Sequence, residues 1–343
     1  MAAEPNLHSS PPARRLFARP SWPGIFLLLL LAGQGCGDNQ SDRALDRGLE
    51  AYRTHADDLA ITEFSEVIRL RPDYADAYSY RGLAYHHKGD DDRAIADYGE
   101  AIRLKPDSVN AYIDRGHAYD HKGDDDRAVA DFNEVIRLDP NQATAYIDRG
   151  NAYNRKGDYD RAIADYDEAM RLNLDYAPVC EENRAYAYSQ KGDYERAILD
   201  YSDAIRLKPD DPSTYYNRGL VYHHKGDDDK AIADFNEAVR LNPGYVLAYN
   251  ELAWLLAVCP DAHFRDGEKA VECAQKACEL SEWKIPVYFS TLAAAYAEAG
   301  DFDDAVKWEN KSLASNASEA GSEKARQRLS LYEQKKPYRE EKL

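Results

Sequence analysis

Histidine side chains in this sequence stand at spacings that suggest metal binding. His117 and His121 are four residues apart, so two imidazoles on one helix would be able to contact the same cation. Adjacent pairs add further imidazoles at His86-His87 and His223-His224. No carboxylate completes an obvious catalytic set with them, and we interpret these histidines as exposed side chains on polar helix faces. The sequence therefore predicts no metal site, no cofactor and no catalytic residue.

Runs of three aspartates, such as Asp90 to Asp92, raise the question of calcium binding. A calcium-binding loop alternates its ligands with other residues, turns at a Gly and ends in a distal Glu, and these runs lack that pattern. Aspartates at the start of a helix cap its free N–H groups and complement its positive end. We interpret the runs as helix starts.

Four cysteines lie outside the N-terminal segment: Cys180, Cys259, Cys273 and Cys278. They form neither a Cys-x-x-Cys metal pattern nor a disulfide framework, so we interpret them as buried, small apolar side chains. A bridge between Cys259 and Cys273 stays open, because both flank the same predicted turn.

The net charge of −18, from 62 acidic and 44 basic residues, limits the classes of partner. An acidic surface repels phosphate backbones, which excludes nucleic acid as a partner. Basic or neutral proteins and peptides suit this charge better.

The N-terminal segment, 1–36, has the features of an export signal. Three arginines precede an apolar run over 25–32, which is shorter than the roughly 20 residues that span a bilayer. Cys36 follows small residues and resembles the lipidated cysteine of bacterial lipoproteins, although Gly33 stands where that family usually has Leu. We predict an exported, membrane-attached protein, periplasmic or on the outer surface, with Cys36 as the lipidation site. Signal cleavage near Gly35, giving a secreted form, and an uncleaved anchor are the alternatives.

An internal repeat dominates the rest of the chain. The phrase KGDDDRA occurs at 88–94 and 122–128, and again at 225–231 with Lys for Arg. A small residue recurs every 34 or 35 residues, at Gly48, Gly82, Gly116, Gly150, Ala185, Gly219 and Ala253. Self-similarity at this period indicates an array of helical repeats.

Each repeat contains two amphipathic stripes. Counted from Ala75 as position 1, they fall at positions 4, 8 and 11 and at 20, 24 and 27, which is the spacing of one helix face. Gly89 can close the first helix in the left-handed conformation, and Pro106 ends the second. We predict a helical hairpin in which Gly82, at position 8, packs closely against the small Ala94 at position 20.

The residues at positions 4, 8, 11, 20, 24, 27 and 32 are Tyr78, Gly82, Tyr85, Ala94, Tyr98, Ala101 and Pro106. This pattern resembles the tetratricopeptide repeat (TPR) family. The resemblance implies an all-α fold, a right-handed α-solenoid of about eight helical hairpins with a C-terminal capping helix. After a linker at 37–40, the array occupies 41–319 in units of about 41–74, 75–108, 109–142, 143–177, 178–211, 212–245, 246–284 and 286–319, and 320–343 form the capping helix and a frayed tail.

In this family the first helices of the hairpins line a concave face. At 100° per residue, positions 2, 6, 9 and 13 lie opposite the packed stripe and are free to contact a ligand. The predicted peptide-binding residues are Tyr80, Leu83, His87, Asp114, His117, His121, Asp148, Asn151, Arg155, Asn183, Tyr186, Asn217, Leu220, His224, Glu251 and Trp254. Among them, Asn183 and Asn217 match the Asn with which some family members hold an extended peptide backbone.

The predicted function follows from what this face contains. The family's clamp for acidic C-terminal tails needs Lys or Arg at positions 2, 5 and 6, which this chain lacks, so basic or aromatic-bearing partners fit better. No segment is left for an enzyme domain, and no phosphate loop or nucleophile elbow occurs. We predict a non-catalytic scaffold or adaptor that binds a protein or peptide in its groove, with membrane contact only through the N-terminal lipid or anchor. A rigid spacer or assembly factor of the cell envelope is the alternative, and metal binding through surface histidines is a minor one.

Overall fold

The computed structural model describes residues 40–315 and 319–340. Within these ranges every regular element is helical, which confirms the predicted all-α fold. The α-helices are α1 (Gln40–Arg53), α2 (Asp57–Leu70), α3 (Ala75–His87), α4 (Asp91–Leu104), α5 (Val109–Lys122), α6 (Asp125–Leu138), α7 (Ala143–Arg155), α8 (Tyr159–Leu172), α9 (Ala177–Gln190), α10 (Tyr194–Leu207), α11 (Pro212–Lys225), α12 (Asp228–Leu241), α13 (Val246–Val258), α14 (Gly267–Leu280), α15 (Pro286–Glu298), α16 (Phe302–Ser315) and α17 (Glu319–Glu333).

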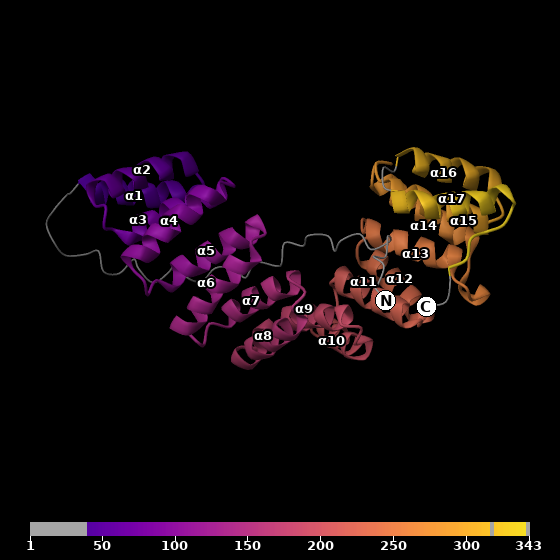
Figure 1. The fold of residues 1–343 in the computed structure, drawn as a ribbon, viewed down its shortest axis with the longest axis horizontal. Coiled ribbons are helices and arrows are strands. Elements are labelled where there is room, and N and C mark those ends of the chain that lie inside the picture. Colours follow the sequence, from indigo (N-terminus) through magenta and orange to yellow (C-terminus); the bar gives the residue numbers. More distant parts are fainter. Residues whose placement is uncertain (1–39, 316–318, 341–343) are drawn as a thin grey trace. The chain divides into compact units, whose positions relative to one another are not determined.

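The helices form two compact units, each a stack of hairpins (Figure 1). The N-terminal unit comprises α1–α9, over the described residues up to 192, and the C-terminal unit comprises α10–α17, from residue 193. In the N-terminal unit α1 packs on α2, α3 on α4, α5 on α6 and α7 on α8, and each second helix also packs on the next hairpin. In the C-terminal unit α11 pairs with α12, α13 with α14 and α15 with α16, and α17 packs on α16. Each unit is therefore a stretch of α-solenoid.

The predicted export segment and Cys36 lie outside the described residues, so export stays a prediction. Among the helices that are described, none is long and apolar enough to cross a membrane.

Glycine and aspartate at the hairpin turns end one helix and start the next. Gly89 has a φ of +77°, in the left-handed region that glycine adopts without strain. Asp90 then accepts a hydrogen bond from the backbone N–H of Arg93 at 3.2 Å, which caps α4. Gly123 and Asp124 repeat this arrangement before α6. The first aspartate of each of these two runs is thus a helix cap, as predicted.

The glycine at position 8 accommodates the aromatic ring at position 24. A Cβ atom at Gly82 would lie 2.7 Å from Cε1 of Tyr98, and one at Gly116 would lie 2.8 Å from Cε1 of Phe132. Non-bonded carbons do not approach so closely without strain. The prediction that Ala94 is the group opposite Gly82 is therefore corrected, because the fully buried Tyr98 ring reaches across and fills that space.

A partly buried ion pair joins the two helices of four hairpins, α3–α4, α5–α6, α7–α8 and α11–α12. Arg81 at position 7 donates to both carboxylate oxygens of Asp97 at position 23, at 2.8 and 2.7 Å. Its third nitrogen reaches Ser65 of the preceding hairpin at 3.0 Å. The same bidentate pairs recur at Arg115–Asp131, Arg149–Asp165 and Arg218–Asp234. Such a bidentate pair fixes the distance between the two helices and also neutralises the charge of the aspartate.

The last hairpin departs from this pattern where α17 covers it. Its position 24 is Glu309, which is fully buried, in place of an aromatic residue. Arg328 of α17 donates to Glu309 Oε1 at 2.9 and 3.2 Å and to Ser290 Oγ at 3.1 Å. Burial raises the pKa of Glu309, and the attraction of Arg328 opposes that rise. The end of the C-terminal unit is therefore closed by a buried ion pair.

The repeat is irregular at two places among the described residues. A 3-10 helix, Leu174–Tyr176, begins at position 32 of the fourth repeat, where Leu174 stands in place of Pro. A second one, Ala262–Phe264, lies in the insertion before α14. Cys259 and Cys273, on either side of that insertion, are both buried and both free, so the bridge that the sequence left open is not formed.

Candidate functional site

The predicted peptide-binding residues come from α3, α5, α7 and α9 in the N-terminal unit and from α11 and α13 in the C-terminal unit. Four are exposed: His87, His121, Arg155 and His224. Seven are half-buried: Tyr80, His117, Asp148, Tyr186, Asn217, Leu220 and Glu251. Five are buried: Leu83, Asp114, Asn151, Asn183 and Trp254. Most of this face is therefore engaged in contacts within its own unit.

Polar residues on this side of the N-terminal unit meet where one hairpin joins the next. We call the residues at positions 12 and 17 of one hairpin, with position 13 of the next, a junction triad. In one triad, Asp91 lies between two imidazoles: His86 Nδ1 is 2.6 Å from its Oδ1, and His121 Nδ1 is 2.6 Å from its Oδ2. Burial alone would raise the pKa of Asp91, but the hydrogen bonds from His121 and His86 outweigh it and leave that pKa below its ordinary value.

The next junction triad carries a fixed positive charge. Arg155 of α7 donates from Nε to Asp125 Oδ1 at 2.7 Å and pairs through Nη2 with Asp120. The triad before the imidazole pair contains His87, whose ring stacks on Tyr52 at 5.0 Å between centroids and lies 3.6 Å from Asp57. Successive junctions therefore have different side chains, with different charges, at the same three repeat positions.

One of the two amides predicted to hold a peptide backbone, that of Asn183, is already bonded. Asn183 Nδ2 donates to Asn151 Oδ1 at 3.0 Å, and the Tyr166 hydroxyl donates to the same oxygen at 2.8 Å. Asn154 Nδ2 donates to the main-chain oxygen of Asn183 at 3.2 Å. A peptide that used the Asn183 amide would therefore have to displace its hydrogen bond to Asn151.

Two predicted groove carboxylates have different surroundings. Asp114 is 7 % exposed, and burial raises its pKa to about 7, although the nearby His117 opposes the rise. Asp148 accepts a hydrogen bond from His117 Nε2 at 3.0 Å. The face therefore carries less negative charge near neutral pH than a count of carboxylates suggests.

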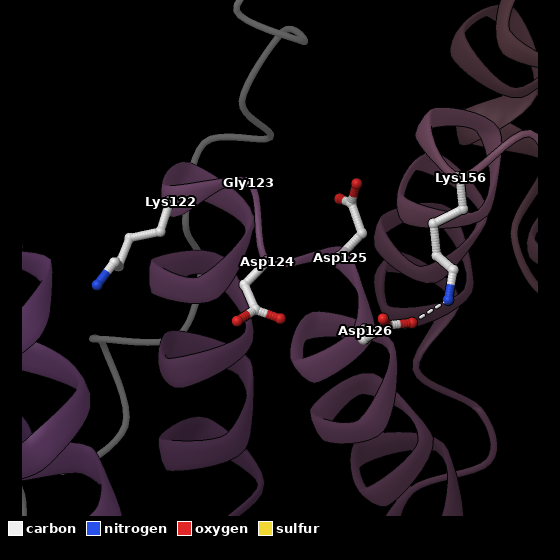
Figure 2. Close-up of a pocket in the computed structure, with 6 residues that line it drawn as sticks. All are labelled: Lys122, Gly123, Asp124, Asp125, Asp126 and Lys156. Carbon is white, nitrogen blue, oxygen red and sulfur yellow. Dashed lines mark hydrogen bonds and ion pairs between the residues drawn. The ribbon is translucent and has the colours of Figure 1, made fainter.

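A ladder of lysine–aspartate pairs runs along the turns of the N-terminal unit. Lys156 of one turn pairs with Asp126 of the turn before it, and Figure 2 shows the lysine crossing to that carboxylate beside Asp124 and Asp125. Equivalent pairs are Lys88–Asp58, Lys122–Asp92 and Lys191–Asp160. The third aspartate of each DDD run at 90–92 and 124–126 thus has a cation partner in the next hairpin.

In the C-terminal unit, the chain's own tail lies on the predicted binding face. After α17 the chain returns toward α13 (Figure 1), and the Tyr338 ring packs on Trp254 with 6.1 Å between centroids. The backbone N–H of Glu340 donates to the carbonyl oxygen of Val258 at 3.0 Å. Trp254 is at position 9 and Val258 at position 13, both on the predicted groove side of α13.

Charged contacts hold the same tail. Arg339 donates to the carbonyl oxygen of Ala257 at 3.4 Å and pairs with Glu298 of α15 at 2.5 Å. Glu340 accepts from the Trp254 indole N–H at 3.4 Å and lies 3.9 Å from His223 Nε2. One main-chain hydrogen bond, one aromatic contact and one basic side chain together form a mode of binding that suits an extended peptide.

Comparison with known families assigns the repeat. Residues 56–89, 82–123, 116–157 and 185–226 match the family described as TPR repeat. Residues 143–176 and 212–245 match the family described as tetratricopeptide repeat. These segments together cover more than half of the chain. The chain belongs to the TPR family.

Solved TPR structures share the fold of this TPR protein. A tetratricopeptide repeat protein from Parabacteroides merdae is 17% identical, with a TM-score of 0.58 over 75% of this chain and 98% of that one. The C-terminal part of a TPR protein from Cytophaga hutchinsonii is 18% identical, with a TM-score of 0.57 over 68% and 94%. Yeast Tom70 is 20% identical, with a TM-score of 0.51 over 88% and 66%. No curated protein matches the sequence.

Two features of this TPR protein were missed from sequence. The junction triads join residues about 30 apart on different hairpins, whereas helical spacing relates histidines only within one helix. The tail was predicted to fray, although Pro337 followed by Tyr338 and Arg339 has the aromatic and basic character predicted for a ligand. This aromatic and basic composition is the sequence signal that could have indicated the binding of the tail.

Proposed function

We propose that the protein is a non-catalytic adaptor that binds an extended segment of a partner protein on the C-terminal unit, where its own tail now lies. The seating of Tyr338, Arg339 and Glu340 on α13 carries this proposal. The TPR family supports the general class, since its members are interaction modules. The tail supports the proposed position of the binding site, because an extended segment of the chain already fits there.

The chemistry of the tail contacts indicates the kind of partner. Trp254 accepts an aromatic ring, and Glu298 accepts a basic side chain. Burial raises the pKa of Glu251 on the same helix to about 7, so this carboxyl ionises readily only above neutral pH. We propose a basic or aromatic-bearing peptide as the partner, which must displace the tail before it binds.

The alternative, a rigid spacer, needs no such contact. Trp254 is 4 % exposed and contacts Tyr338 of the tail, and a spacer has no requirement for an aromatic contact with its own terminus. The tail contact therefore favours the adaptor.

A peptide with the sequence of residues 335–343 tests this proposal. We expect the labelled peptide to bind the full chain with Tyr338→Ala and Arg339→Ala at least about tenfold more tightly than the unchanged chain, because the tail of the latter competes for the site. Fluorescence anisotropy measures both affinities.

Two further substitutions make the test specific. Adding Trp254→Ala to the tail-released chain should abolish binding, whereas adding Trp283→Ala, at an exposed tryptophan of the same unit, should leave the affinity within about twofold. Equal, weak binding by all variants would reject the peptide site and favour the spacer.

We also propose that the adaptor is exported and membrane-attached through Cys36. The apolar run and the small residues before Cys36 support this proposal. Cys36→Ala should move the protein from the membrane to the soluble fraction when cells are fractionated. An unchanged distribution, with Cys180→Ala as the control, would contradict lipidation.

A further inference from the structure

We propose that His86, Asp91 and His121 bind one divalent transition-metal cation of the Zn²⁺ class. One ring nitrogen of each histidine and one carboxylate oxygen of Asp91 all lie within 4.8 Å of one another. Two imidazoles and one carboxylate are a recognised donor set for such ions. The set joins α3, α4 and α5, so the bound ion would link two neighbouring hairpins.

The donor atoms need only a small adjustment to surround an ion. Metal–ligand distances of about 2.0–2.2 Å in a tetrahedral site place donor atoms about 3.4 Å apart. The side chain of His121 is 64 % exposed and is free to turn toward the ion, whereas Asp91 is 9 % exposed and fixed. Asp91 and His86 therefore form the rigid part of the site, and His121 closes it.

Two helix ends that favour a cation lie near the site. His86 is in the last turn of α3 and His121 in the last turn of α5, so the negative ends of these two dipoles oppose the positive end of α4, which begins at Asp91. The neighbouring cations already have carboxylate partners of their own: Lys88 pairs with Asp58, Arg93 with Asp90 and Lys122 with Asp92.

The next junction provides an internal comparison. There the same three repeat positions hold Asp120, Asp125 and Arg155, and the guanidinium supplies a permanent positive charge between the carboxylates. At the His86 junction no such charge is built in. A bound metal ion would supply it, with each ligating imidazole carrying its proton on the ring nitrogen that faces away from the ion.

The direct test is titration of the chelator-treated full chain with Co²⁺, followed by displacement with Zn²⁺. We expect visible d–d absorption that saturates at one Co²⁺ for this site, and a rise of the unfolding temperature with added Zn²⁺. His121→Ala should weaken Co²⁺ binding at least about tenfold, since one of three ligands is lost.

A control and a rescue separate ligation from a structural effect. His117→Ala, one turn earlier on α5 and paired with Asp148, should leave the affinity within about twofold. His121→Cys should restore binding and add a thiolate charge-transfer band, because a thiolate also binds these ions. If Co²⁺ binding is absent, or is unchanged in His121→Ala, the inference is overturned and the triad is only a hydrogen-bonded junction.

Discussion

Arg328→Ala is expected to lower the free energy of unfolding of the C-terminal unit by about 3–5 kcal/mol. The substitution leaves Glu309 buried without its cation, at a position where the other hairpins have an aromatic ring. The cost of an unpaired buried charge exceeds the net gain from the pair, so removing one partner has a large effect. Urea denaturation followed by tryptophan fluorescence measures it, because Trp254, Trp283 and Trp308 all lie in this unit.

The exposed pair Arg240–Glu237 in the same unit is the matched control. Arg240→Ala should change the stability by no more than about 0.5 kcal/mol, because water screens this pair. Replacing both Arg328 and Glu309 with Met should recover much of the loss, since no buried charge then remains. Equal effects of Arg328→Ala and Arg240→Ala would show that the buried pair does not hold α17.

Gly116→Val should destabilise the N-terminal unit by about 3 kcal/mol. The first added carbon would lie 2.8 Å from the Phe132 ring, and the two methyl groups of Val would add to the overlap. Phe132 is 1 % exposed, and close-packed interiors leave little room for a ring to shift. Hydrogen exchange in α5 and α6 measures this loss within the intact chain.

Gly99→Ala in α4 is the opposite case. A Cβ atom there would meet only Arg115 Nη1 at 3.7 Å, an ordinary contact. Because Gly is a poor helix residue, this change should stabilise the unit by about 0.5–1 kcal/mol. If Gly116→Val were as harmless as Gly99→Ala, the contact between positions 8 and 24 would not limit the approach of the two helices.

The repeat period and local residue chemistry were enough to predict the hairpins. Gly89 and Asp90 act within a few residues of each other, so their roles at the turn follow from the sequence alone. The partner of Gly82 was misassigned to Ala94, because the periodicity places positions 20 and 24 on the same face and does not show which side chain reaches farther.

The candidate site was predictable in outline only. The helix face of Trp254 follows from its repeat position, but its cover by Tyr338 depends on a chain reversal after α17. Asp91 was correctly placed at a helix start, yet its contact with His121 depends on how the next hairpin docks. Contacts across hairpins require their relative placement, which no local pattern contains.

The junction triads also mean that the hairpins of the N-terminal unit are not interchangeable, although their cores are nearly identical. If α3–α4 and α5–α6 were exchanged in order, Asp120 and Asp125 would face the single imidazole of His87 instead of the guanidinium of Arg155. The apolar core would tolerate that exchange, but the charges at the junction triads would no longer balance. Three side chains at each junction therefore determine which hairpin can follow which.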